Sequence, residues 1–158
     1  MIYRNSLATP PALFCPRRPP LLVFESKPQF EPSKVQGNGQ RILVIDDEAS
    51  IADSLAEILS EYGYQALAFY DGHAAIAATR EKCPDLVLCD VIMPQLNGVD
   101  TVLAIRELCS TARILLFSGQ ATTTDILEKA RAQGHWFEVL PKPIHPNELL
   151  KRLATKKN

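Results

Sequence analysis

Short apolar runs recur from residue 41 onward, each bounded by charged or turn-forming residues. Four of these runs have the length of buried strands, over residues 42–45, 86–89, 113–118 and 137–140. Such a run leaves neither strand face polar, which is typical of a parallel sheet covered on both sides. An alanine-containing segment over residues 64–70 predicts a fifth, weaker strand.

The intervening segments carry apolar residues three and four positions apart, the spacing of one helical face. In the segment that begins at Ser50 these residues are Ile51, Leu55, Ile58, Leu59 and Tyr62. Further helices are predicted over residues 73–82, from Leu96-Asn97-Gly98 onward, from Asp125 to before Gly134, and over 146–155. Asp125, with Glu128 three positions later, resembles a capping box. Five strands alternating with five helices predict an α/β fold, a doubly wound parallel sheet with helices on both faces.

Residues 1–39 differ in composition from the rest of the chain, because they hold seven of its 12 prolines. The segment ends in Gly37-Asn38-Gly39 and has no helical or strand period, which predicts a disordered, extended tail before a domain over residues 40–156. Its five basic and two acidic residues give +3, so the remainder carries −4 within a net charge of −1. A docking role for the apolar stretch 21–24 stays open.

The net charge of −1 gives the whole chain no attraction to nucleic acid or to anionic membrane. The apolar runs are too short to cross a bilayer, and prolines interrupt the first 24 residues, which argues against a signal peptide. The four cysteines, Cys15, Cys83, Cys89 and Cys109, form neither a CxxC pair nor a zinc-type spacing. We therefore expect a cytoplasmic protein with reduced cysteines.

Polar side chains follow four of the predicted strands: Asp46 and Asp47, Asp90, Ser118, and Lys142. Because the carboxyl ends of parallel strands share one edge of the sheet, we expect these groups to lie close together. Three crowded carboxylates repel one another, and a hard divalent cation such as Mg²⁺, which prefers oxygen ligands, removes that cost. The sequence therefore predicts a Mg²⁺ site beside a hydroxyl and an ammonium group.

The strand-end motifs together resemble the receiver domain of bacterial two-component response regulators. They are Asp46-Asp47, Asp90 with Met93-Pro94 and Gly98 behind it, Ser118-Gly119, and Lys142-Pro143. The resemblance implies a flavodoxin-like fold with strand order 2-1-3-4-5. It also implies a phosphoacceptor module in which Asp90 takes a phosphoryl group from a histidine kinase or phosphotransfer protein, which alters a surface that binds a downstream protein. Because the sequence ends at Asn158, a stand-alone receiver without an output domain is expected.

The resemblance also assigns the metal ligands. Asp47 and Asp90 are implied as direct ligands, Asp46 as a ligand through water, and the backbone carbonyl of Ile92 as the remaining protein ligand. As a carboxylate nucleophile, Asp90 must be ionised and accessible to form an aspartyl phosphate. The expected catalysis is confined to the protein's own phosphorylation and dephosphorylation, so we expect no enzyme in the ordinary sense.

Three further residues are implied to contact the phosphoryl group. Lys142 supplies a compact positive charge, Ser118 a hydroxyl donor, and Gly119 a backbone amide that no side chain shields. In the family the Lys142-Pro143 bond is usually cis, which the sequence permits.

Val139 departs from the family's pattern, and Trp136 carries a separate expectation. Val139 stands where the family commonly has an aromatic residue three positions before the lysine, so the usual aromatic rotation cannot report phosphorylation. Trp136, at the start of the predicted fifth strand, is expected to pack against the domain.

Two alternative functions stay open. Val139 favours a receiver-fold interaction module that has lost its phosphorylation switch. A Mg²⁺-dependent phosphatase of the haloacid dehalogenase type would also use an aspartyl phosphate, but Asp46-Asp47-Glu48 does not match its Asp-x-Asp motif. Direct binding to nucleic acid or membrane is not expected.

Overall fold

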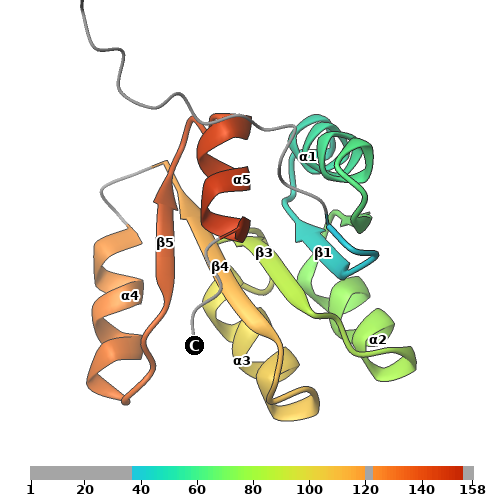
Figure 1. Cartoon of the computed structure of the whole chain (residues 1–158). Coiled ribbons are helices and arrows are strands. Elements are labelled where there is room, and N and C mark those ends of the chain that lie inside the picture. Colours follow the sequence, from blue (N-terminus) through green and yellow to red (C-terminus); the bar gives the residue numbers. More distant parts are fainter. Residues whose placement is uncertain (1–36, 120–122, 155–158) are drawn as a thin grey trace, which may run out of the picture.

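Five parallel strands form one sheet in the order β2-β1-β3-β4-β5 in the computed structural model, which describes residues 37–119 and 123–154 (Figure 1). The strands are β1 (Arg41–Ile45), β2 (Gln65–Phe69), β3 (Leu86–Asp90), β4 (Arg113–Ser118) and β5 (Glu138–Pro141). The predicted flavodoxin-like order is therefore confirmed. Residues 1–36 of the predicted tail over residues 1–39 lie outside the described residues.

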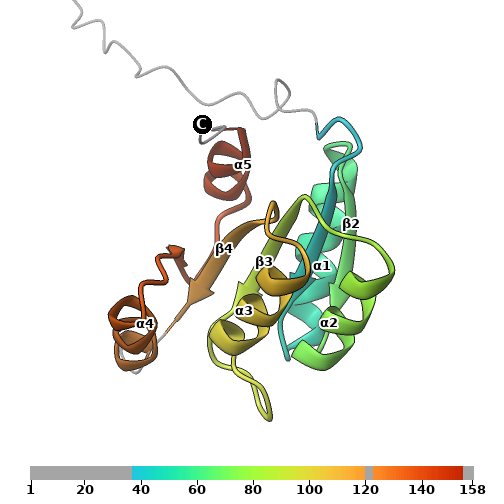
Figure 2. The same ribbon diagram turned by 90° about the horizontal axis from the view of Figure 1, so that it is seen from below.

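A helix follows each strand, and the helices cover both faces of the sheet (Figures 1 and 2). They are α1 (Ala49–Glu61), α2 (Gly72–Glu81), α3 (Gly98–Leu108), α4 (Thr123–Ala132) and α5 (Pro146–Ala154). The predicted capping box is wrong, because α4 begins at Thr123 and Asp125 lies inside its first turn. Thr123 is buried and hydrogen-bonded to Ser118, so a tertiary contact rather than the Asp125 pattern accompanies the start of the helix.

The apolar runs alternate between two core layers. On β1, Ile42 and Val44 pack with α1 and α5, whereas Leu43 and Ile45 pack with α2 and α3. All five residues of β3 are buried, because this strand is central and covered on both faces. The runs without a polar face in the sequence thus correspond to the strands covered by helices on both sides.

Residues 37–39, before β1, contact the folded domain. The Gly37 N–H donates to the Tyr62 carbonyl at 2.8 Å, and the Gly39 N–H donates to the Gly63 carbonyl at 3.0 Å. A Cβ on Gly37 would overlap the Tyr64 ring, so only glycine fits against this ring. The prediction that Gly37 and Gly39 belong to the tail is therefore wrong, since both pack against the turn between α1 and β2.

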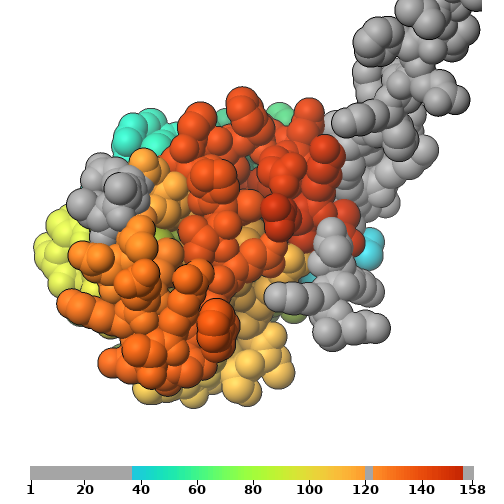
Figure 3. Space-filling view, turned by 90° about the vertical axis from the view of Figure 1, so that its left-hand side faces the viewer, coloured from blue at the N-terminus to red at the C-terminus, as the bar shows by residue number. Residues whose placement is uncertain are grey.

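Strand β5 forms one edge of the sheet, and α4 and α5 flank it on the side shown in Figure 3. The prediction that Trp136 packs against the domain is wrong. Trp136 precedes β5 and is 72% exposed, with the Arg131 guanidinium 5.6 Å from its ring centroid. Val139, by contrast, is half-buried against the layer that contains α4.

Two of the cysteines are bonded to each other. Cys83, after α2, and Cys109, at the end of α3, form a disulfide with a Cα–Cα distance of 5.8 Å, and Cys89 is a buried free thiol. The expectation that all cysteines are reduced is therefore contradicted. The two bonded residues are 26 positions apart, and their proximity arises from helix packing that no local motif encodes. Within the described residues, no helix has the length and apolar character needed to span a membrane.

Candidate functional site

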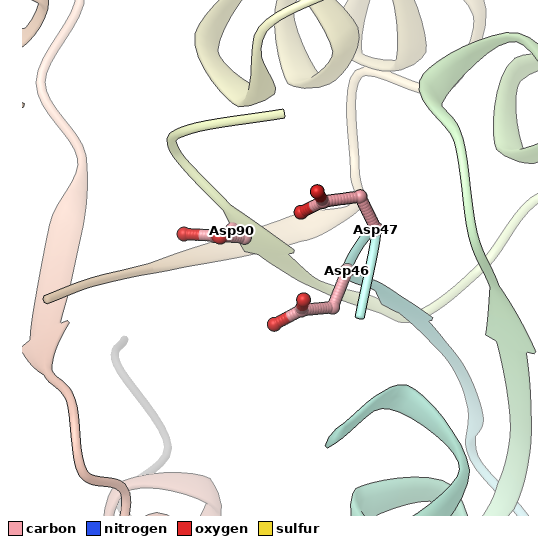
Figure 4. A group of neighbouring side chains, drawn as sticks. All are labelled: Asp46, Asp47 and Asp90. Atoms are coloured by element: carbon pink, nitrogen blue, oxygen red, sulfur yellow. The ribbon is translucent and has the colours of Figure 1, made fainter. Parts of the chain in front are cut away.

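The carboxyl ends of β1 and β3 bring three aspartates together. The strands pair in parallel with Ile45 opposite Cys89, so the next residues, Asp46 and Asp90, emerge side by side. Carboxylate oxygens of Asp46, Asp47 and Asp90 lie within 4.8 Å of one another. Figure 4 shows the three side chains extending from the two neighbouring strand ends into the same region. The predicted convergence at this edge is therefore present.

Lys142 reaches this group from the far end of the chain. Its Nζ donates to Asp46 Oδ2 at 2.8 Å and to Asp90 Oδ2 at 2.9 Å, across 96 and 52 residues of sequence. The ammonium also lies 5.3 Å from the Phe117 ring centroid, so the aromatic ring on β4 supports it from one side. The Lys142-Pro143 peptide bond is cis.

Burial makes the charges of this group strongly interdependent. Asp46 is 1% exposed and Asp90 7% exposed, whereas Asp47 is exposed. Burial raises the pKa of the Asp90 carboxyl above its ordinary value, although the hydrogen bond and charge of Lys142 act in the opposite direction. Burial alone would lower the pKa of Lys142, but its hydrogen bonds to Asp46 and Asp90 outweigh this effect and raise it.

The oxygen atoms at this edge fit a hard divalent cation. One oxygen of Asp46 accepts the Glu48 N–H at 2.9 Å, and one of Asp90 accepts the Ile92 N–H at 3.4 Å. Within the described part of the chain, three carboxylates face the one ammonium of Lys142, which leaves excess negative charge that an ion such as Mg²⁺ would neutralise. The role of the Ile92 carbonyl as a ligand stays a prediction.

Ser118 and Gly119 lie on the side of the site formed by β4. The Lys142 N–H donates to the Ser118 carbonyl at 2.8 Å, so the backbone places the two residues next to each other. A Cβ on Gly119 would lie 3.4 Å from Lys142 Cβ, which shows how closely Gly119 approaches the lysine. The Ser118 hydroxyl forms a hydrogen bond with the Thr123 hydroxyl. Sequence reasoning missed Thr123, because the threonines of this segment form no recognisable motif.

Gly98 determines how closely α3 approaches the site. Its N–H donates to the Val91 carbonyl at 3.0 Å, and a Cβ at this position would overlap the Asp90 carbonyl oxygen. Only glycine therefore lets the start of α3 pack against the strand end that carries the central aspartate. The sequence motif identified Gly98, and the structure supplies the steric reason for it.

An open hollow lies beside Lys142, between α1 and the segment that leads into α5. It has a volume of about 530 Å³ and is lined by Ser50, Ile51, Ser54, Leu55, Ile58, Gly119, Lys142, Pro143, Ile144 and Pro146. Much of this lining is apolar, and one end of it includes the lysine that contacts Asp90. A partner bound in the hollow would therefore be close to the Asp90 carboxylate.

Comparison with known proteins places this arrangement in a family. Residues 42–154 match the family described as the response regulator receiver domain. The DNA-binding response regulator MtrA of Mycolicibacterium paratuberculosis is 34% identical over 117 residues, covering 74% of this chain and 51% of the relative. The chain therefore spans about half the length of the MtrA proteins it matches.

Solved structures agree with this assignment. A response regulator receiver domain protein from Clostridium thermocellum has a TM-score of 0.65 and 27% identity, covering 73% of this chain and 91% of that one. The chemotaxis protein CheY4 of Vibrio cholerae has a TM-score of 0.64 and 28% identity, covering 73% and 96%. Both structures share the five-stranded doubly wound architecture described above.

Proposed function

This chain belongs to the family of response regulator receiver domains, and from this membership we propose that Asp90 is its phosphoacceptor. The donor is a histidine kinase or a phosphotransfer protein. The observation that carries the proposal is the ammonium of Lys142, held 2.9 Å from Asp90 Oδ2 and 2.8 Å from Asp46 Oδ2. A buried carboxylate at a strand end, paired with a cation that also binds a second acid, is suited to receive a phosphoryl group.

In the proposed reaction a carboxylate oxygen of Asp90 attacks the phosphorus of a phosphohistidine. The phosphorus–nitrogen bond breaks, the electron pair returns to the imidazole, and an acyl phosphate forms on Asp90. Asp46, Asp47 and Asp90 would hold Mg²⁺, which when bound would neutralise charge on the phosphoryl oxygens. Lys142 transfers its hydrogen bond from the Asp90 carboxylate to a phosphoryl oxygen, and its distance to Asp90 allows this with a small side-chain movement.

Ser118 and Gly119 complete the proposed phosphoryl site. The Ser118 hydroxyl exchanges its hydrogen bond with Thr123 for one with a phosphoryl oxygen, and the Gly119 amide donates another. Because Thr123 begins α4, this exchange releases a contact at the start of that helix. Phosphorylation thereby changes the surface formed by α4 and β5, and this change does not require an aromatic residue at the position of Val139.

The donor protein is proposed to dock in the hollow beside Lys142. Its apolar lining from α1, with Ile51 and Ile58, offers a surface for a helix of the donor, and Pro143 and Ile144 form the opposite wall. A docked donor histidine would then approach Asp90 across Lys142. We place this exchange in the cytoplasm, and the only catalysis is on the protein's own aspartate.

The downstream partner is proposed to be a protein that recognises the altered surface. The first relatives are named as DNA-binding response regulators, and this chain matches about half of their length. Val139 supports a second candidate, an interaction module whose binding does not depend on phosphorylation. In that case partner affinity would be the same with and without beryllofluoride, a mimic of the phosphoryl group.

Incubation with acetyl phosphate and Mg²⁺ tests the phosphoacceptor. We expect the wild type to gain one phosphoryl group by intact-mass measurement and Asp90→Asn to gain none. Asp125→Asn, which changes an exposed aspartate in the first turn of α4, serves as the matched control and should be modified like the wild type. An unmodified wild type, or full labelling of Asp90→Asn, would contradict the proposal. Steady hydrolysis of a phosphomonoester would favour the phosphatase instead.

A further inference from the structure

The disulfide joins two helices on the same face of the sheet. Helices α2 and α3 lie next to each other (Figures 1 and 2), and Cys83 and Cys109 follow their carboxyl ends. At the opposite ends of the helices, a Cβ on Gly72 would overlap the Thr101 hydroxyl, so the pair is closely packed there as well. The two helices are therefore held at one end by packing and at the other by a covalent bond.

The disulfide closes residues 83–109 into a covalent loop, and this loop contains the central part of the proposed phosphorylation site. Between Cys83 and Cys109, which are 26 positions apart, lie the whole of β3, Asp90, the turn after it and α3. The bond itself lies beyond the amino end of β3, at the sheet edge opposite Asp90. It can therefore restrain this segment without occupying the site.

The two cysteines differ in their access to solvent. Cys83 is exposed even in the bonded form, whereas Cys109 is 4% exposed. A small oxidant would reach Cys83 first, and Cys109 lies within disulfide reach at a Cα–Cα distance of 5.8 Å. This is the arrangement of an exposed attacking sulfur with a buried resolving sulfur.

We propose that Cys83 and Cys109 form a redox modification site, at which hydrogen peroxide oxidises the two thiols to a disulfide and so closes the covalent loop that contains β3 and α3. The Cys83 thiolate attacks a peroxide oxygen, the oxygen–oxygen bond breaks, and a sulfenic acid and hydroxide form. The Cys109 sulfur then attacks the Cys83 sulfur, the sulfur–oxygen bond breaks, and a second hydroxide leaves. Both hydroxides take up the protons lost by the thiols, so one peroxide is reduced to two waters and the two thiols become one disulfide.

Both sulfurs lie at the carboxyl ends of helices, where the partial negative charge gives no stabilisation to a thiolate. Redox catalysts instead favour the reduced state by stabilising a thiolate. The Cys83–Cys109 bond is therefore suited to persist once formed and to restrain the domain, rather than to exchange rapidly with other proteins.

Peroxide treatment of the reduced full chain tests the site. Peptide mapping after blocking free thiols should recover one bond, Cys83–Cys109, and dithiothreitol should reverse it. The oxidised form should unfold at higher urea concentration, with a folding equilibrium constant raised by about 100-fold or more from loop closure. The difference should be absent in Cys83→Ser and Cys109→Ser and retained in Cys15→Ser, the matched control.

Three results would contradict the proposed redox site: no disulfide after peroxide treatment, a disulfide that involves Cys15 or Cys89, or equal urea midpoints for the oxidised and reduced forms. Phosphorylation by acetyl phosphate is measured on both forms in parallel. We expect both to be modified, because the bond lies at the opposite edge from Asp90. Failure of phosphorylation would thus count against the phosphoacceptor, and failure of the bond to form against the redox site.

Discussion

At the residue scale, the main feature of the site is that its carboxylates outnumber the positively charged side chains that contact them. Among the residues that the structure describes, Lys142 alone pairs with Asp46 and Asp90, both of which are almost fully buried. In water such a pair contributes little, but the loss of one partner from a buried pair leaves the other charge without compensation. Asp46 and Asp90 both depend on this ammonium, so the effect of removing it exceeds that of a surface ion pair.

Lys142→Met tests this dependence, because methionine keeps an unbranched aliphatic side chain and removes the ammonium, including its cation–π contact with the Phe117 ring. In the presence of EDTA we expect the free energy of unfolding to fall by about 1–3 kcal/mol, as for a buried polar group that loses its partner. Saturating Mg²⁺ should recover part of the loss, since the ion compensates the same carboxylates. Urea unfolding with EDTA and with Mg²⁺ measures both effects.

Lys129→Met, at an exposed position of α4, is the matched control and should unfold like the wild type. If Lys142→Met were as stable as the wild type in EDTA, the carboxylates would not depend on this ammonium.

The individual site residues could be predicted because each stands at a recognisable place, the end of an apolar run. Asp46, Asp90 and Lys142 needed only the rule that parallel strands end at one edge. The Ser118–Thr123 hydrogen bond could not be predicted, because it depends on how the start of α4 packs. Trp136 shows the same limit, since its aromatic character favoured burial but its place before β5 leaves it in solvent.

At the element scale, the sequence predicted all five strands and five helices because most strands are covered on both faces. A strand buried in this way has no polar face, so its run of apolar residues is unambiguous. Helix starts were less predictable: the Asp125 pattern placed α4 two residues late. Local capping patterns compete with tertiary contacts, and here the buried Thr123 lies at the start of the helix.

Helix α1 contributes its own prediction, because several of its residues line the hollow beside Lys142. Ile58→Lys would place a charge in this apolar lining. We expect phosphotransfer from a histidine kinase to fall about tenfold or more, as for a central interface residue, with the rate from acetyl phosphate nearly unchanged. Comparing the two donors separates docking from chemistry, because the small donor needs no protein contact.

Ser60→Lys adds the same charge to an exposed position of α1 outside the hollow and is the matched control. Equal losses with both donors would show that the Ile58 substitution damages the site itself. Unchanged transfer from the kinase would place the docking surface elsewhere.

At the scale of the whole molecule, the fold joins two ends that behave differently. The carboxyl edge of the sheet carries three acids, two of which share the ammonium of Lys142, whereas the amino edge carries the Cys83–Cys109 bond. The first was predictable, because strand ends converge by topology. The disulfide was not, because two cysteines 26 positions apart become neighbours only through the packing of α2 against α3.

The excess of acids at one edge means that a divalent cation should stabilise the whole domain. Binding to the folded state alone, at ten times its dissociation constant, adds about 1.4 kcal/mol by mass action. For a domain of this size that corresponds to a rise of about 4 °C in the melting temperature. We expect Mg²⁺ to produce this rise, EDTA to reverse it, and Asp47→Asn to weaken it. Glu57→Gln, an exposed acid on α1, should leave it intact. A melting temperature independent of Mg²⁺ would mean that Lys142 already compensates the carboxylates and that Asp46, Asp47 and Asp90 do not bind the ion.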